Sequence, residues 1–127
     1  MRRINLLSGV CGCLIFLLSC STSSTELPLI KFISPEVDTI HDLTTELEVE
    51  IDIFDDIMIE DYTFWLQSAS GLEYYSEYKD NIKQSDFTLK YRFDLSKNIN
   101  NDFTIHLKVS DNDGNTVHKQ LKVTVYQ

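Results

Sequence analysis

The strongest constraint on the fold of this 127-residue chain is an alternation of acidic and aliphatic residues over eight positions, from Glu46 to Ile53. Successive side chains of a β-strand point to opposite faces, so a period of two places one face in a core and the other in water. The same alternation recurs over Phe103 to Val109 and over Leu121 to Val125. These three segments predict half-buried β-strands.

The other candidate strands have a weaker alternation. These strands cover residues 29–33, 62–68 and 87–95, together with a short edge strand over 72–78. Helix signals are nearly absent. About seven short strands with turns roughly ten residues apart are typical of an antiparallel sandwich. The sequence therefore predicts an all-β domain.

The last two strands predict a hairpin in which aliphatic residues lie opposite one another. Pairing Leu107 with Leu121 satisfies this rule and leaves the loop Asp113-Gly114-Asn115, in which Gly and Asn tolerate a positive φ. A two-residue Asp-Gly turn would expose half of the core face, so we reject that register.

The histidines follow from this register. His106 and His118 come to lie four residues apart along the strand direction, roughly 13 Å, which is too far to share one zinc ion. His41 lies alone in a loop. We expect exposed strand residues here and no metal site.

The first 19 residues have the features of an export leader. Arg2 and Arg3 precede an apolar segment, and Leu17-Leu18-Ser19-Cys20 resembles the bacterial lipoprotein cleavage box. In that family a diacylglycerol is attached to the cysteine, the leader is removed and the new amino terminus is acylated. The resemblance therefore implies a lipid anchor at Cys20, and two acyl chains already suffice for stable anchoring. The rival interpretations are a simple secretory signal and a retained helix, but a bilayer span needs roughly 20 apolar residues.

The domain organisation follows from this cleavage site. Residues 1–19 are the signal peptide, residues 20–27 are the lipidated cysteine and its tether, and residues 28–127 form one domain. Ser21 stands where an aspartate retains lipoproteins at the inner membrane of some bacteria with two membranes. We expect an outer-membrane lipoprotein that faces the periplasm, and the cell surface stays open as an alternative.

Removal of the leader also determines which cysteines and which charged residues remain in the mature protein. Cys11 and Cys13 leave with the leader, so no disulfide and no thiolate metal site are expected. The leader removes two of the 11 basic residues and none of the 20 acidic ones. An acidic surface repels phosphate backbones, which excludes nucleic acid as a partner. Cations, basic proteins and neutral glycans remain as candidate partners.

Two segments carry a further resemblance. The run from Val109 to Asn115, followed by an alternating terminal strand, resembles the last hairpin of bacterial immunoglobulin-like and cadherin-like domains. The run from Phe54 to Tyr62 is similar to their link between the second and third strands. With the cleavage box, the order of elements is similar to an uncharacterised family of short lipoproteins with one such domain of unknown function. The resemblance implies an immunoglobulin-like antiparallel β-sandwich of about seven strands over Pro28 to Gln127.

The link and the last hairpin loop lie at the same end of such a sandwich. That placement brings together five carboxylates, those of Asp55, Asp56, Asp61, Asp111 and Asp113. Calcium takes 6 to 8 oxygen ligands, which such a cluster resembles. Because Asp, Asn and Gly are also ordinary turn formers, a calcium site and a plain pair of turns both stay open.

An aromatic set of Trp65, Tyr74, Tyr75 and Tyr78 is a second candidate site, with the first three as the ligand-binding residues. Exposed rings of this kind stack on sugars or on partner proteins. The alternative is that Trp65 is the core tryptophan of its strand with Phe64 pointing outward, and we favour that burial.

Two further features are weaker. Asp38-Thr39-Ile40 resembles the tripeptide used for O-glycosylation of exported proteins in some bacteria, with Thr39 as the acceptor. The acidic face of the strand from Glu46 to Asp52 is suited to a basic partner, although a solvated face with lysines across the strand is the commoner explanation.

The sequence holds no nucleophile elbow, metal-binding His-Glu helix or phosphate-binding glycine loop. We therefore expect no enzyme and no cofactor other than calcium. The leading hypothesis is a membrane-anchored interaction or structural module of the cell envelope that contacts an envelope protein or a glycan. The alternative is a calcium- or glycan-binding lipoprotein that uses the acidic loops or the aromatic set.

Overall fold

The computed structural model of the protein describes residues 26–36, 39–42, 46–95 and 101–126. The described residues form seven β-strands. These are β1 (Leu29–Ser34), β2 (Thr39–Asp42), β3 (Glu46–Ser68), β4 (Glu73–Lys79), β5 (Gln84–Asp94), β6 (Asn101–Asp111) and β7 (Thr116–Tyr126). Within this part of the chain, no helix is long and apolar enough to cross a membrane.

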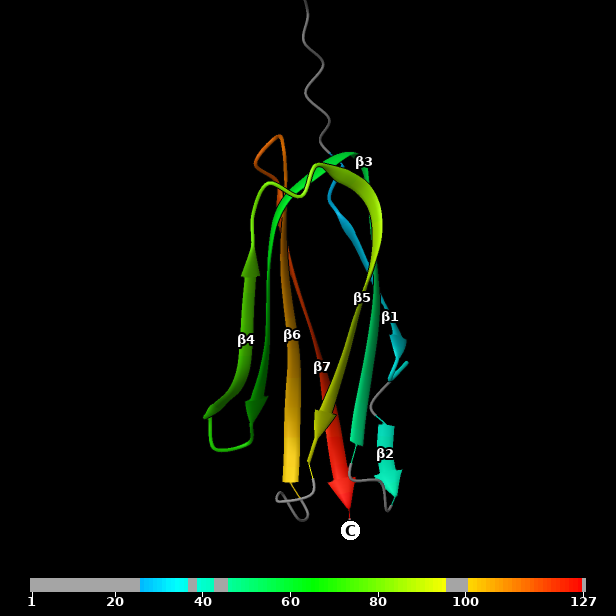
Figure 1. The fold of residues 1–127 in the computed structure, drawn as a ribbon, viewed down its shortest axis with the longest axis vertical. Helices are drawn as coiled ribbons and strands as arrows, with labels where there is room; N and C mark the ends of the chain where they lie inside the picture. The colour runs from blue at the N-terminus through cyan, green and yellow to red at the C-terminus, as the bar shows by residue number, and fades with distance from the viewer. Residues whose placement is uncertain (1–25, 37–38, 43–45, 96–100, 127) are drawn as a thin grey trace, which may run out of the picture.

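The long strand β3 belongs to both layers of the fold. Its first part, residues 46–54, lies between β1 and β5 in antiparallel ladders. Its last part, residues 59–68, lies between β4 and β6. Strand β7 pairs with β6, and the short β2 runs parallel to the end of β7. One layer is therefore β1-β3-β5 and the other is β4-β3-β6-β7-β2 (Figure 1), which is the arrangement of an immunoglobulin-like sandwich.

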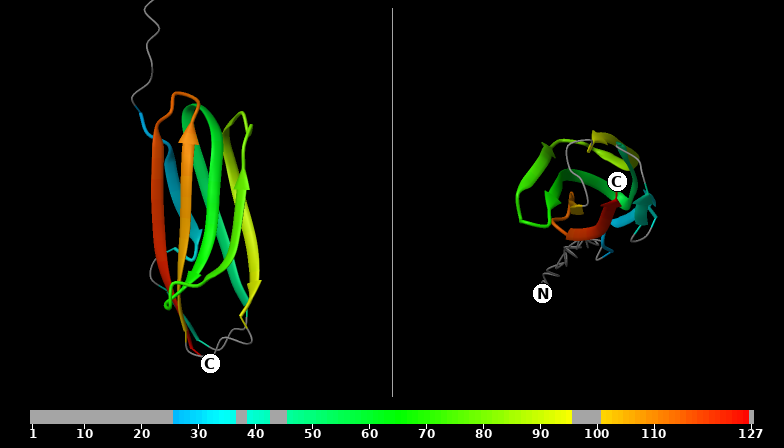
Figure 2. Two further views of the ribbon diagram at one scale, coloured as in Figure 1. Left: turned by 90° about the vertical axis from the view of Figure 1, so that its left-hand side faces the viewer. Right: turned by 90° about the horizontal axis from the view of Figure 1, so that it is seen from below.

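The core lies between the two layers, and Figure 2 shows in its end-on view that the strands enclose a single interior. Alternate residues of β3 point into it, and the parity changes where the register shifts between Ile59 and Asp61. The buried side chains of β3 are those of Leu47, Val49, Ile51, Ile53, Ile59, Tyr62, Phe64 and Leu66. Facing them are alternate residues of β6 and β7, among them Phe103, Ile105 and Val123. The predicted all-β sandwich and the period of two are confirmed.

Two strands differ from the prediction. The segments 46–53 and 62–68 are parts of one continuous strand, because residues 55–58 stay extended while the ladder register shifts between Phe54 and Ile59. Strand β2 was not predicted, since four residues are too few to show a periodic pattern. The number of strands agrees with the expectation, although the strands themselves are divided differently.

The predicted register of the last hairpin is wrong by two residues. Leu107 pairs with Lys119, and Ile105 pairs with Leu121. The turn has the expected three-residue length but lies one residue earlier, over Asn112 to Gly114, because the Asp111 amide donates to the carbonyl of Asn115 at 2.9 Å. Gly114 adopts a φ of 86°. A shift by an even number keeps the same side chains in the core, so the hydrophobic pattern did not distinguish the two registers.

Our expectation for Trp65 is also wrong. Phe64 is 0% exposed in the core, whereas Trp65 lies on the opposite, outer face of β3. The physical reason is the alternation itself, since Tyr62, Phe64 and Leu66 are all buried and the residue between the last two must point outward.

Candidate functional site

The outer face of the second sheet carries an aromatic and polar surface. Cross-strand pairing places two rows side by side across β4, β3, β6 and β7. One row is Tyr78, Thr63, Lys108 and His118, and the other is Ser76, Trp65, His106 and Gln120. We call these eight residues the Trp65 face. Neither row contains an acidic residue, although acidic residues outnumber basic ones in the whole chain.

Three rings are stacked at the centre of the Trp65 face. The Trp65 and His106 rings have centroids 4.5 Å apart and planes 4° apart. The His118 ring lies 5.1 Å from Trp65, with an interplanar angle of 24°. His106 is only 8% exposed although it is on the outer side of the sheet. The stacked indole and the neighbouring imidazole account for this burial.

The two imidazoles are in direct contact. His106 Nδ1 and His118 Nε2 are 3.2 Å apart, within hydrogen-bond distance. The predicted separation of roughly 13 Å is wrong because it rested on the wrong hairpin register: in the observed one, His118 lies opposite Lys108 and diagonal to His106. Burial, followed by the charge of His118, lowers the pKa of His106. Its other ring nitrogen, Nε2, is buried without a hydrogen-bond partner.

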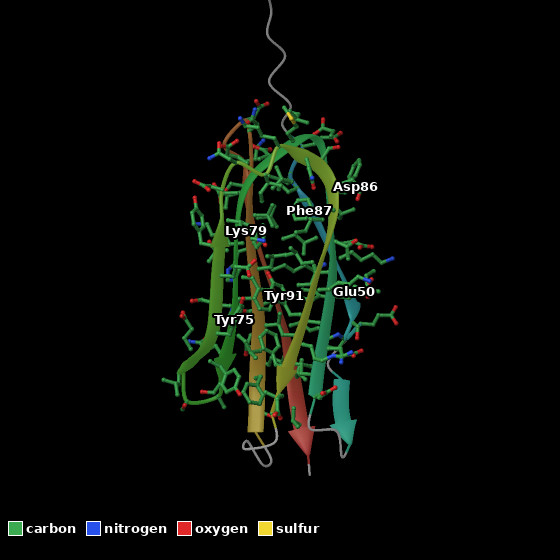
Figure 3. All side chains as sticks on the ribbon, viewed as in Figure 1. Glu50, Tyr75, Lys79, Asp86, Phe87 and Tyr91 are labelled. Carbon is green, nitrogen blue, oxygen red and sulfur yellow. The ribbon has the colours of Figure 1, made fainter. Side chains whose placement is uncertain are left out.

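The predicted aromatic set does not form one platform. Tyr75 lies between β4 and β5, where its ring centroid is 5.9 Å from that of Tyr91 (Figure 3). The Tyr74 hydroxyl donates to the carbonyl of Asp94 at 3.0 Å. Both tyrosines therefore bridge to β5, whereas Trp65 lies on the outer face. The aromatic residue that shares the Trp65 face is Tyr78, which is 61% exposed.

A half-buried polar cluster between β4 and β5 was missed in the sequence. The carboxylate of Glu77 accepts hydrogen bonds from the hydroxyls of Tyr62 at 2.6 Å, Tyr75 at 2.9 Å and Tyr91 at 3.1 Å. The bond from Tyr62 is the main reason that the pKa of Glu77 lies below its usual range. Burial, together with Glu77, raises the pKa of Tyr62 to about 12. The available signal was that Glu77 has the same strand parity as Tyr75 and so points toward the interior.

The predicted contact between the acidic link and the last hairpin is present. The Asn112 amide donates to the carbonyl of Met58 at 2.9 Å, and Ile59 pairs with Asp111. Asp111 is 3% exposed and organises the turn. Its Oδ1 accepts from the amides of Asp113 and Asn115, at 2.9 and 2.8 Å.

Asp55 is the least satisfied member of the acidic cluster. It is 2% exposed, its Oδ2 accepts from the Ile57 amide at 3.2 Å, and its Oδ1 is buried without a partner. Burial raises the pKa of this carboxyl, and the charges of Asp111 and Asp56 raise it further. Ionised Asp55 therefore destabilises the folded state.

The other three carboxylates of the cluster are more accessible. Asp56 and Asp113 are exposed, and Asp61 is half-buried. Among the residues that the structure describes, no group of three or more acidic, histidine or cysteine side chains is arranged to hold a metal ion. Calcium binding stays a prediction.

The acidic face of the first part of β3 is paired across the strand. Glu48 bonds to Arg92, and Glu50 lies 3.3 Å from the Lys90 ammonium. Figure 3 shows Glu50 on the side of the sandwich away from Tyr75. Because these pairs are exposed they contribute little stability, and they match the solvated face with basic cross-strand residues that the sequence analysis regarded as commoner.

The chain enters the sandwich at its acidic end. The carbonyl of Glu26, just before β1, accepts a bond of 3.4 Å from the Asn115 side chain in the β6–β7 hairpin (Figure 1, top). Cys20 lies outside the described residues. Thr39 is the first residue of β2, opposite Val123, but its side chain and Asp38 also lie outside the described part.

Comparisons with known proteins support the fold. Neither a protein-family model nor a curated protein matches the sequence. Among solved structures, the chain is similar to CopC from Methylosinus trichosporium OB3b, with a TM-score of 0.50 and 14% identity over 77% of this chain and 94% of CopC. An engineered protein gives a TM-score of 0.53 with 11% identity, over 79% of this chain and 20% of that one.

A third similar structure is OgpA from Akkermansia muciniphila, with a TM-score of 0.50 and 14% identity. The match covers 82% of this chain and 31% of OgpA, so this chain spans less than a third of that protein. At these identities the likeness shows an immunoglobulin-like β-sandwich and nothing further about activity.

The raised pKa of Asp55 makes stability depend on pH. Ionised Asp55 costs free energy above its folded-state pKa, and this cost disappears as the pH falls through that value toward the ordinary 3.8. Asp55→Asn keeps an acceptor for the Ile57 amide and removes the charge. We expect the variant to be about 1 kcal/mol more stable than the wild type at pH 7, with the advantage gone near pH 4.

Urea unfolding at the two pH values measures this difference. An exposed acidic residue of β5 provides the control, because Asp86→Asn should change stability little at either pH. An Asp55→Asn advantage of the same size at both pH values would contradict the assignment.

Proposed function

We propose that this protein is a lipid-anchored, non-catalytic interaction module of the bacterial cell envelope, held at the periplasmic side of the outer membrane through Cys20. The observation that carries the proposal is the Trp65 face. There, Trp65 and Tyr78 project from the outer side of a sheet among neutral and basic residues. The partner would contact this face, while the interior of the sandwich is filled by side chains.

The lipid anchor is supported by the sequence of the leader and by where the sandwich begins. Cys20 precedes Glu26 by six residues, which in a fully extended chain reach about 20 Å. The described body would therefore lie close to the membrane, and a short tether would limit the partners to components of the same envelope.

The anchor predicts the result of cell fractionation. Wild-type protein should be recovered in the membrane fraction as a processed form, because acylation at Cys20 precedes removal of the leader. Cys20→Ser should lose the acyl chains, which we expect to appear as loss of labelling by a fatty-acid probe. Cys13→Ser is the matched control within the leader and should be labelled like the wild type. Labelling of Cys20→Ser at the wild-type level would contradict the anchor.

The interaction module predicts contacts at one face of the sandwich. A photoreactive amino acid placed at Gln120 lies on the Trp65 face, and one at Thr88 lies on the outer side of the opposite sheet. We expect ultraviolet light applied to intact cells to give a discrete cross-linked species from position 120 and none from position 88. Trp65→Ala should remove the species, because it takes away the largest ring of the face. Equal cross-linking from both positions would argue against a specific surface.

The second candidate function is calcium or glycan binding. The buried, unpartnered Oδ1 of Asp55 beside Asp111 favours calcium, because a cation would supply the missing partner. A glycan is favoured by the outward position of Trp65 and Tyr78, whereas Tyr74 and Tyr75 lie on another side.

Calcium binding predicts a change in the melting temperature. A cation that binds only the folded state stabilises it by mass action, so millimolar calcium should raise the melting temperature of the wild type and not that of Asp55→Asn. Magnesium is the control ion, because it demands a stricter geometry. An unchanged wild-type melting temperature at millimolar calcium would dispose of the calcium alternative.

A further inference from the structure

The arrangement of the two histidine rings on the Trp65 face allows more than the hydrogen bond between them. The two imidazoles meet edge to edge, since their centroids are 5.4 Å apart and their nearest nitrogens 3.2 Å apart. Their planes differ by 24°, and both rest on the same indole. His106 Nδ1 and His118 Nε2 therefore point into a common space between the rings.

That spacing matches two ligands of one metal ion. Metal–imidazole bonds are about 2.0 to 2.1 Å long, so two of them at angles from square-planar to tetrahedral hold their nitrogens about 2.9 to 3.3 Å apart. The observed 3.2 Å lies within this interval. Stacking on Trp65 fixes both rings before any ion arrives, which lowers the entropic cost of binding.

We propose that His106 Nδ1 and His118 Nε2 form a two-histidine site for a transition-metal ion, with copper(II) held most tightly and nickel(II) and zinc(II) less so. The remaining coordination positions are open to water. His118 is exposed and provides the path of entry, while the buried His106 provides the fixed ligand.

The surroundings of the pair select this class of ion. Lys108 lies opposite His118, and no acidic residue belongs to either row of the Trp65 face. Hard cations such as calcium and magnesium require oxygen ligands and negative charge, so they are disfavoured. Imidazole nitrogens suit copper, nickel and zinc, and copper(II) stands highest in the Irving–Williams order.

Both facing nitrogens must be free of protons when the ion is bound. In the absence of metal, one of them carries the hydrogen of the N–H···N bond. Metal binding therefore requires the donor ring to change tautomer, so that its own proton lies on the nitrogen away from the pair. That nitrogen is Nδ1 of His118, whose exposed side chain can hydrogen-bond to water, or Nε2 of His106. This exchange of tautomers leaves the net charge of the protein part unchanged.

The experiment uses the indole as a built-in reporter, since Trp65 is the only tryptophan of the chain. Full-length protein, purified in detergent without a histidine tag, is titrated with copper(II), nickel(II) or calcium chloride while Trp65 fluorescence is recorded. We expect saturable quenching by copper and by nickel, reversal of the nickel effect by excess zinc, and no response to calcium.

Variants localise the ion. His118→Gln should raise the midpoint of quenching by at least roughly tenfold, about 1.4 kcal/mol, and its unchanged melting temperature would show that the exposed position leaves the fold intact. His41→Gln, in β2, should quench like the wild type. Gln120→His, opposite His106, should lower the midpoint by adding a third imidazole.

Two results would overturn the proposal. The first is the absence of saturable quenching by either copper or nickel in the wild type. The second is a wild-type midpoint in His118→Gln, because quenching would then come from ions bound elsewhere, including the three cysteines. The proposal does not depend on the lipid anchor, so failure of one leaves the other standing.

Discussion

The whole structure depends on one uninterrupted strand that changes layer. Alternate residues of β3 are buried both before and after residues 55–58, so a single strand supplies an inner strand of each sheet. The register shift between Phe54 and Ile59 lets the strand leave one ladder and join the other. Such irregularities bend a strand and re-aim its side chains. Here they also bring the buried Asp55 to the bend, beside the last hairpin.

The features that follow from side-chain parity could be predicted from the sequence, and those that depend on register could not. The alternation from Glu46 to Ile53 predicted the buried face correctly, and the same rule, applied strictly, would have placed Trp65 outside. Side-chain parity does not predict the hairpin register. The register is set by the turn at Asp111, whose side-chain hydrogen bonds leave no trace in the hydrophobic pattern. The contact between His106 and His118 depends entirely on that register and was therefore missed.

Polar groups close the sandwich where its two sheets do not pair. Strands β4 and β5 form no backbone ladder with each other, and side chains join them instead. The carboxylate of Glu77 in β4 accepts from Tyr91 in β5, and it also accepts from Tyr62 in β3 and Tyr75 in β4. A carboxylate with this many donors stays ionised inside a partly buried site. The polar cluster thus fixes the separation of the two edge strands. Purely apolar contacts between them would leave that separation less well defined. This placement also explains why Tyr74 and Tyr75 are bridging residues and not part of the Trp65 face.

The bond between Glu26 and Asn115 has a consequence for how the protein stands in its surroundings. It places the start of the described chain at the end of the sandwich that carries Asp55 and Asp111. With acyl chains at Cys20, this negative pole would point down at the phospholipid headgroups, and anionic lipids would push it away. The long axis of the sandwich would then be perpendicular to the membrane plane. The Trp65 face would be directed along the bilayer, toward neighbouring molecules.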